Sequence, residues 1–244
     1  MKNIILSIPV IKAMNYAVSE KPDRDFIYGG VIISNGDMGL NGRKQPVYTL
    51  GNNHGGIVQA NGEWYIFYHR QTNGTEFSRQ GCAEKISILE DGTIPQVEIT
   101  SCGLNGGPLK GSGIYPAAIA CHMTCSDTMD YQNPIMRTQT RITEQQNITF
   151  ITSIKNGTVL GYKYFLIDDI ASLILELRGD FEGTVKVLAT ESEEDLLGKQ
   201  TLKLKTDVWS NVRIMVQLPK NNVTALYFYF EGVGVVDMRN FAFL

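Results

Sequence analysis

Alternating hydrophobic and polar positions run through much of the chain and predict strands. In residues 64–69 (WYIFYH), Trp64, Ile66 and Tyr68 fall on one face and the intervening residues on the other. This two-residue period is typical of a half-buried β-strand. The same period recurs at residues 173–178, 184–189, 211–218 and 225–230. Helical periodicity is scarce and reaches a single turn at residues 191–197 (ESEEDLL). The pattern therefore predicts an all-β protein.

Short groups of Gly, Asn and Asp separate these stretches and predict turns. They are Asn61-Gly62, Asp91-Gly92, Asn156-Gly157, Arg178-Gly179-Asp180 and Gly232-Val233-Gly234. From about residue 148 onward the expected strands recur every 8–12 residues or so, a spacing typical of a β-sandwich.

A glycine-rich seam lies near the middle of the chain, at residues 101–113 (SCGLNGGPLKGSG). The stretch from 124 to 147 is polar and has no clear core-facing pattern. We therefore expect one unit over residues 1–120 and a second unit, the sandwich, over residues 121–244.

Composition and charge narrow the classes of partner. The chain has 244 residues, of which 43% are hydrophobic and 19% charged, which is typical of a globular protein. The formal net charge of −3 offers no basic footprint, so no nucleic-acid partner is expected. No apolar run reaches the length that a membrane span needs, so no membrane partner is expected either.

The cysteines and the N-terminus carry weaker signals. Cys121 and Cys125 flank His122, but no second pair completes a zinc pattern, which favours unpaired buried cysteines. Lys2 and the apolar run of residues 4–11 resemble the start of a secretion signal, but Lys12 interrupts the run. We expect a strand here rather than a signal peptide. The sequence therefore assigns no cellular location to this chain.

Five motifs in a fixed order lead to a known family. They are residues 16–37 (YAVSEKPDRDFIYGGVIISNGD), 52–56 (NNHGG), 62–72 (GEWYIFYHRQT), 77–86 (FSRQGCAEKI) and 91–101 (DGTIPQVEITS). This order resembles the last blades of glycoside hydrolase family 43, five-bladed β-propellers that cleave arabinofuranosyl and xylosyl linkages. Residues 161–165, 178–183 and 226–243, with Trp209, look like a carbohydrate-binding module of family 6. The resemblance implies a partial propeller followed by a jelly-roll β-sandwich.

The resemblance also gives roles to two residues of the first unit. His54, in NNHGG, matches a histidine that points into the propeller channel beneath the sugar and helps to hold an ion or an ordered water. Arg79 matches an arginine at the rim of the sugar pocket, where a guanidinium suits vicinal hydroxyls. The alternatives are a buried histidine bonded to a carbonyl and a surface arginine. For His69 we favour a structural hydrogen bond at the end of its strand.

The sandwich offers candidates of its own. Tyr162, Tyr164 and Asn240 are predicted to contact a carbohydrate, because such modules place rings and amides against sugars. Modules of this family often hold a structural calcium, and Asp237 is the candidate ligand. Trp209 is expected to pack in the core.

Inverting glycosidases use two carboxyl groups, one as acid and one as base. In the family these groups precede the motifs matched here, so the resemblance implies that both lie upstream of this chain, and no catalytic residue is assigned. Asp23 and Asp25 are expected on the surface, and Asp37 is expected to bond to its own turn. Glu84 could face the channel, but a lone carboxylate gives no division of acid and base roles.

The resemblance thus implies the C-terminal portion of a glycoside hydrolase acting on arabinofuranosyl or xylosyl linkages of plant-type polysaccharides. Because the catalytic carboxylates are expected outside it, this chain alone is expected to be inactive. The alternative is a non-catalytic carbohydrate-binding protein. Either hypothesis predicts an oligosaccharide or polysaccharide partner.

An incomplete propeller leaves one blade face open, which a homodimer or a missing N-terminal half would cover. The parent enzyme is expected to be secreted or periplasmic.

Overall fold

The computed structural model describes residues 4–10, 12–125 and 129–244. Met1–Asn3 and Ile11, which belong to the signal-like stretch, lie outside the described residues. The strands are β1 (Ile4–Val10), β2 (Ala13–Ser19), β3 (Ile27–Ser34), β4 (Gly56–Ala60), β5 (Glu63–Gln71), β6 (Arg79–Ile86), β7 (Leu109–Lys110), β8 (Gly113–Pro116), β9 (His122–Cys125), β10 (Arg141–Gln145), β11 (Ile148–Ile154), β12 (Thr158–Ile167), β13 (Ser172–Leu188), β14 (Leu196–Met215) and β15 (Asn222–Phe243). Short 3-10 turns, such as η5 (Glu193–Asp195), complete an all-β fold.

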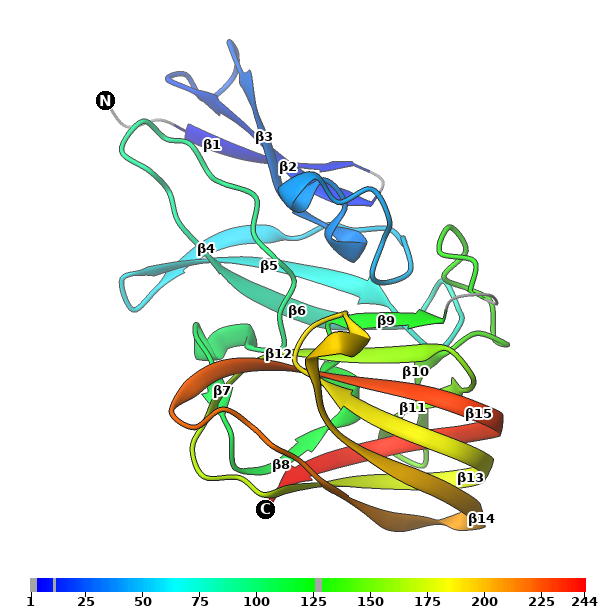
Figure 1. Ribbon diagram of the computed structural model, residues 1–244. Coiled ribbons are helices and arrows are strands. Elements are labelled where there is room, and N and C mark those ends of the chain that lie inside the picture. Colours follow the sequence, from blue (N-terminus) through cyan, green and yellow to red (C-terminus); the bar gives the residue numbers. More distant parts are fainter. Residues whose placement is uncertain (1–3, 11, 126–128) are drawn as a thin grey trace.

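The first half of the chain forms two small antiparallel sheets, β1-β2-β3 and β4-β5-β6 (Figure 1). The alternation at residues 64–69 is confirmed as part of β5, where Ile66 and Tyr68 are buried and the ring of Phe67, on the other face, is 40% exposed. The two sheets share one apolar core. Its buried members are Met14, Tyr16, Ile32, Ile33, Ile66, Tyr68, Ile86, Ile94, Ile99 and Cys121.

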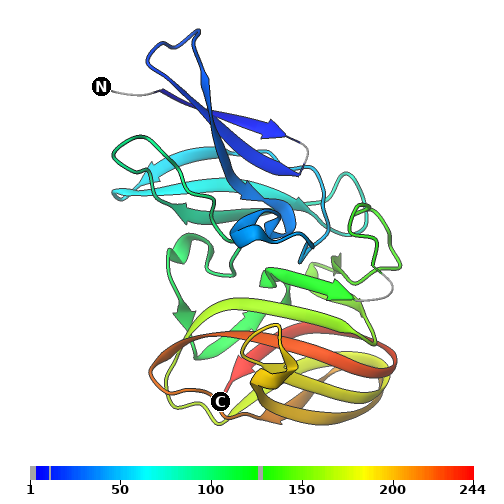
Figure 2. The same cartoon turned by 45° about the horizontal axis from the view of Figure 1, so that its top comes forward.

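The second half is one nine-stranded sheet that curves around a larger core (Figure 2). Along its main path the order is β10-β11-β15-β12-β7, and β13 joins it by pairing with both β14 and β15. The aromatic centre of the core consists of Tyr162, Phe165, Phe228, Phe230 and Phe241. The strands β7 and β8 also belong to this sheet, because they pair with β12 and β15 respectively. The sandwich sheet therefore begins at Leu109.

Two of the predicted turns are wrong. The stretches Arg178-Gly179-Asp180 and Gly232-Val233-Gly234 lie inside the continuous strands β13 and β15. A Cβ on Gly179 would come within 2.4 Å of the Val235 carbonyl oxygen, and a Cβ on Gly234 within 2.1 Å of the Asp180 carbonyl oxygen. Both glycines have positive φ. They mark a close approach of two bent strands rather than a reversal of the chain.

A buried lysine joins the two halves of the molecule. Lys163 on β12 is 3% exposed, and its Nζ lies 2.7 Å from Glu98 Oε1 and 3.5 Å from Asp37 Oδ2. Asp37 does not bond to its own turn as expected; its Oδ1 accepts the Ile99 backbone N–H at 2.8 Å. Burial raises the pKa of Asp37, and the charge of Lys163 opposes that rise. One lysine thus pairs with two carboxyl groups from the first half.

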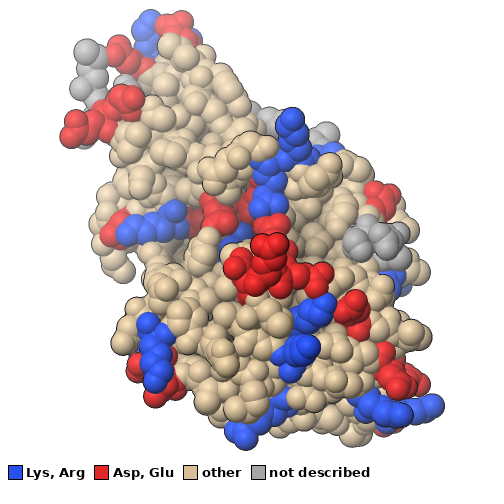
Figure 3. Space-filling model, viewed as in Figure 1, with Lys and Arg blue, Asp and Glu red and all other residues tan. Residues whose placement is uncertain are grey.

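Further polar contacts hold the halves together. The buried guanidinium of Arg70 on β5 donates to the backbone carbonyls of Ala118 and Ala120. Arg43, between β3 and β4, donates to Glu191 Oε1 at 2.7 Å, next to η5. On the face drawn in Figure 3, basic and acidic side chains meet across this junction. None of the helical segments in the described part of the chain could span a membrane.

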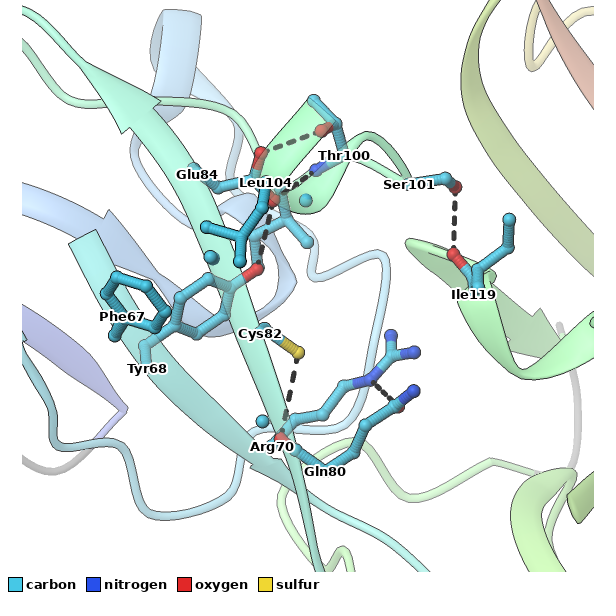
Figure 4. A pocket seen from close by; sticks show the side chains of 14 residues that line it. Phe67, Tyr68, Arg70, Gln80, Cys82, Glu84, Thr100, Ser101, Leu104 and Ile119 are labelled. Carbon is cyan, nitrogen blue, oxygen red and sulfur yellow. Dashed lines mark hydrogen bonds between the residues drawn. The ribbon is translucent and has the colours of Figure 1, made fainter. Parts of the chain in front are cut away.

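Glu84 on β6 anchors the segment that leads toward the sandwich (Figure 4). Its carboxylate accepts from the Thr100 backbone N–H at 2.8 Å, from Thr100 Oγ1 at 2.7 Å and from the Tyr68 hydroxyl at 3.2 Å. Glu84 is 4% exposed, and burial raises its pKa to about 7 despite these hydrogen bonds. The carboxyl therefore changes its charge close to neutral pH.

Replacing Lys163 by methionine should destabilise the protein strongly. The variant leaves Asp37 buried without its cation, a loss of about 3–5 kcal/mol in the free energy of unfolding. Chemical denaturation followed by tryptophan fluorescence measures this loss. The control is Lys203→Met, because Lys203 is 84% exposed and 3.8 Å from Glu182; it should change the free energy by less than about 0.5 kcal/mol. Equal losses in the two variants would show that the Lys163 cluster does not hold the halves together.

Glu84→Gln should alter the pH dependence of stability between pH 4.5 and 7. The pKa of Glu84 in the folded state lies above the ordinary value of 4.5. Its contribution to the free energy of unfolding is therefore fully present below pH 4.5 and is lost as the pH rises through 7. Glutamine keeps the polar contacts but never ionises. The free energy of unfolding of the variant should therefore exceed that of the wild type by an amount that grows with pH and reaches about 3 kcal/mol at pH 8.

The measurement is the difference between the unfolding free energies of the variant and the wild type across this pH range. Taking the difference cancels groups with the opposite trend, such as His122, whose pKa burial lowers to about 4. A difference that stays constant with pH would contradict the buried, titrating carboxyl.

Candidate functional site

The NNHGG loop before β4 is held in place by an amide ladder. The buried Asn53 donates from Nδ2 to Asn35 Oδ1 at 2.9 Å, and Asn35 donates from Nδ2 to the Gly51 carbonyl at 2.8 Å. Gly55 then passes so close to β5 that a Cβ there would lie 1.7 Å from the Phe67 carbonyl oxygen. Only glycine fits this position, so the sequence N-H-G-G fixes where the intervening histidine lies.

His54 and His69 form a pair at the start of the candidate site. Their ring centroids are 4.2 Å apart with an interplanar angle of 67°, an edge-to-face contact. His69 Nδ1 donates to the His54 carbonyl oxygen at 3.2 Å, which confirms the structural hydrogen bond expected of His69. His54 itself is exposed, so the alternative of a buried histidine satisfied by a carbonyl is wrong.

The bond at Nδ1 determines the tautomer of His69. Its Nε2 is then an acceptor, and it is buried with no partner among the described residues. Burial lowers the pKa of His69, and the nearby His54 and Arg79 lower it further. At neutral pH His69 is therefore a neutral imidazole that presents one free acceptor.

Arg79 opens β6 near this pair and is exposed. Its guanidinium donates to the backbone carbonyls of Glu76 and Ser78, so no carboxylate among the described residues neutralises it. His54 and Arg79 are thus exposed polar side chains, whereas the unpartnered Nε2 of His69 is buried. Such exposed side chains suit a neutral ligand with many hydroxyls.

The sandwich candidates do not come together. Tyr162 is fully buried, and its hydroxyl donates to the Ala117 carbonyl; the prediction that its ring meets a carbohydrate is therefore corrected. Tyr164 lies at the junction and donates to Glu98 Oε2 at 2.7 Å. Asn240 donates to Glu176 Oε2 at 2.7 Å and lines a separate cavity of about 420 Å³.

Sequence reasoning missed a stack of arginine and aromatic side chains on the sandwich. The Arg178 guanidinium lies 4.7 Å from the Phe150 ring centroid and 4.4 Å from that of Trp209. Arg239 lies 5.2 Å from the same Trp209 ring. Trp209 is thus half-buried under guanidinium groups rather than packed in the core as expected. Arg178 and Arg239 are about sixty residues apart in the chain, and one sequence carries no signal that they share a ring.

The residues predicted to hold metals have other neighbours in the structure. Asp237 accepts from Arg178 Nε at 3.0 Å. Beside His54 lies the His69 ring. Nowhere in the described ranges do three His, Cys, Asp or Glu side chains converge. Calcium at Asp237 and the ion at His54 both stay predictions.

Several carboxylates that line cavities are already engaged. Glu84 is bound by Thr100 and Tyr68, Glu98 by Lys163 and Tyr164, and Glu176 by Arg239. Glu84 lies in a cavity of about 380 Å³ at the junction, which Figure 4 shows together with Arg70 and Gln80. That cavity contains no second carboxylate among its described lining residues.

The amino-acid sequence of the chain is similar to that of a known enzyme. No protein-family model matches the chain. A xylosidase/arabinosidase of Thermoclostridium stercorarium is 42% identical over 249 aligned positions, which cover 97% of this chain and 52% of the relative.

One solved structure supports the fold. An arabinoxylan arabinofuranohydrolase of glycoside hydrolase family 43 from Bacillus subtilis, solved with cellotetraose, matches 95% of this chain and 47% of its own length, with a TM-score of 0.51 and 19% identity. A family 6 module from Clostridium stercorarium, solved with cellobiose, matches 57% of this chain with a lower TM-score of 0.46 and 18% identity. The chain spans about half the length of the two enzymes that it matches. In sequence it is similar to about half of a xylosidase/arabinosidase, and its all-β fold resembles part of a glycoside hydrolase family 43 enzyme.

Proposed function

We propose that this chain is part of a glycoside hydrolase that acts on arabinofuranosyl or xylosyl linkages of plant-type polysaccharides. The observation that carries the proposal is the 42% identity to a xylosidase/arabinosidase over nearly the whole chain. The exposed polar side chains of His54 and Arg79 support it, because an imidazole and a guanidinium can hydrogen-bond to sugar hydroxyls.

The part that this chain plays is sugar recognition. Inverting hydrolysis needs two free carboxyl groups on opposite sides of the scissile bond. Glu84 and Glu98 are occupied by hydrogen bonds and by Lys163. As the family resemblance implies, the acid and the base come from residues outside this chain, while Arg79 and His54 hold the sugar in place.

A non-catalytic carbohydrate-binding protein is the second candidate. The polar surface of the sandwich favours it: Arg178, Trp209 and Arg239 lie between two cavities of about 600 and 420 Å³. Binding without turnover would be the whole function in that case. The two candidates differ in whether hydrolysis appears when the chain is joined to a segment that supplies the carboxylates.

The purified 244-residue chain should not hydrolyse aryl arabinofuranosides or aryl xylosides. A positioned acid or base contributes about 10²–10⁴-fold each, so without both the rate should equal that of the buffer. Release of nitrophenol over one day measures this, with an active arabinofuranosidase as the positive control. Clear turnover that Glu84→Gln abolishes would place a catalytic carboxyl inside this chain and overturn the proposal.

Arg79→Ala should weaken the binding of an arabinofuranosyl-substituted xylo-oligosaccharide to this chain. Loss of hydrogen bonds from a charged group should lower the affinity about tenfold, and His54→Ala should lower it less. Titration calorimetry measures the affinities. The matched control is Arg213→Ala, an exposed arginine on β14. An equal loss in Arg79→Ala and Arg213→Ala would show that Arg79 is only a surface arginine.

A further inference from the structure

A small cavity lies between the two halves of the chain, and Arg79 is one of its lining residues. Its volume is about 190 Å³, enough for one monosaccharide unit. The loop between β5 and β6 forms one wall, and the hairpin of β10 and β11 forms the other. The first wall consists of Thr72, Asn73, Ser78, Arg79 and Gln80, and the second of Ile142, Thr143, Glu144 and Thr149.

The two walls are fixed to each other by hydrogen bonds. The Asn73 backbone N–H donates to the Ile142 carbonyl at 2.6 Å, and Thr143 Oγ1 donates to Asn73 Oδ1 at 2.6 Å. Because β10 is the outer strand of the sandwich sheet, the loop pairs with its open edge. The cavity is therefore a built feature of the junction rather than a gap between independent bodies.

The charged side chains that line the cavity are unpaired. Arg79 donates only to backbone carbonyls of its own loop. Glu144 is exposed and has no ion-pair or hydrogen-bond partner among the residues that the structure describes. The lining also carries the hydroxyls of Thr72, Ser78 and Thr149. A guanidinium, a carboxylate and several hydroxyls around one small space suit a neutral polyhydroxylated ligand, because each can bond to hydroxyl groups.

An exposed aromatic ring stands at the rim. Phe77, directly before Ser78, is 92% exposed, and its backbone N–H is fixed by Thr75 Oγ1 at 3.1 Å. A phenylalanine so open to water on an ordered loop has no packing role. Beside a polar cavity, its ring offers an apolar surface for the C–H face of a sugar.

We propose that the β5–β6 loop and the β10–β11 hairpin together form a sugar subsite that binds one unit of a neutral pentose oligosaccharide. Glu144 and Arg79 bond to its hydroxyls, and Phe77 contacts its apolar face. This inference rests on the proposed function and extends it, because a residue of the sandwich now determines what binds next to Arg79.

The test is titration calorimetry of the full chain with xylotetraose and with xylotetraose carrying one arabinofuranosyl branch. Glu144→Ala should weaken binding about tenfold, as expected for hydrogen bonds to a charged group. Glu144→Gln, which keeps an acceptor, should weaken it less, and Phe77→Ala should weaken it about fivefold. Both side chains are exposed, so thermal unfolding should show unchanged stability in each variant.

The controls are Glu182→Ala and Val233→Ala. These residues face each other across β13 and β15, the side chain of Glu182 is 73% exposed, and Val233 is 80% exposed. Both variants should bind like the wild type. Amide chemical shifts should move at residues 72–79 and 141–149 when the sugar is added.

Two results would overturn the subsite. If the chain binds the sugars but Glu144→Ala and Phe77→Ala have no effect, and shifts move elsewhere, the subsite is wrong while the carbohydrate partner stands. If the wild-type chain binds neither sugar, the carbohydrate partner fails as well, and the subsite with it.

Discussion

The burial of the Lys163 ammonium group between two carboxylates is the interaction on which the arrangement of the two halves depends. Lys163 comes from the sandwich, whereas Glu98 and Asp37 come from the part of the chain before it. A charge at 3% exposure is tolerated only when partners of opposite charge surround it. Moving the halves apart without exposing these groups to water would leave each buried charge without its partner. The ion pairs therefore hold the sandwich in one position against the first half.

A fixed junction matters for function because it brings distant segments together. The β5–β6 loop and the β10–β11 hairpin are about seventy residues apart in sequence, yet two hydrogen bonds at Asn73 join them. Arg79 therefore lies in a cavity that neither half could form alone. A sandwich on a flexible tether would move independently of the first half, whereas this one contributes a wall to the cavity that Arg79 lines.

The chemistry that we propose for His54, His69 and Arg79 is recognition rather than proton transfer. His69 is a neutral imidazole with Nδ1 bonded to a carbonyl and Nε2 without a described partner. Arg79 is free of carboxylates. Glu84 is a buried carboxyl group whose pKa is raised to about 7. It accepts hydrogen bonds from Thr100 and Tyr68 and so anchors a segment of the junction. Its raised pKa reflects burial at a structural position.

The sequence by itself determined the local features of this protein. The alternation of WYIFYH predicted β5, the pair Asn61-Gly62 predicted the hairpin turn before it, and the order of five motifs indicated the family resemblance. These signals are local, because side-chain periodicity and backbone φ depend on near neighbours.

Only the tertiary structure decided contacts between residues far apart in the chain. Gly179 and Gly234 looked like turns, but each permits a close approach to the other long strand. Tyr162 looked like a sugar-binding ring, but its side of β12 faces the core. Asp37 was expected to bond to its own turn, but it forms an ion pair with Lys163 and accepts a hydrogen bond from the Ile99 backbone N–H. In each case the deciding partner lies tens of residues away or more, and no periodicity in one sequence encodes which distant group will fill a given space.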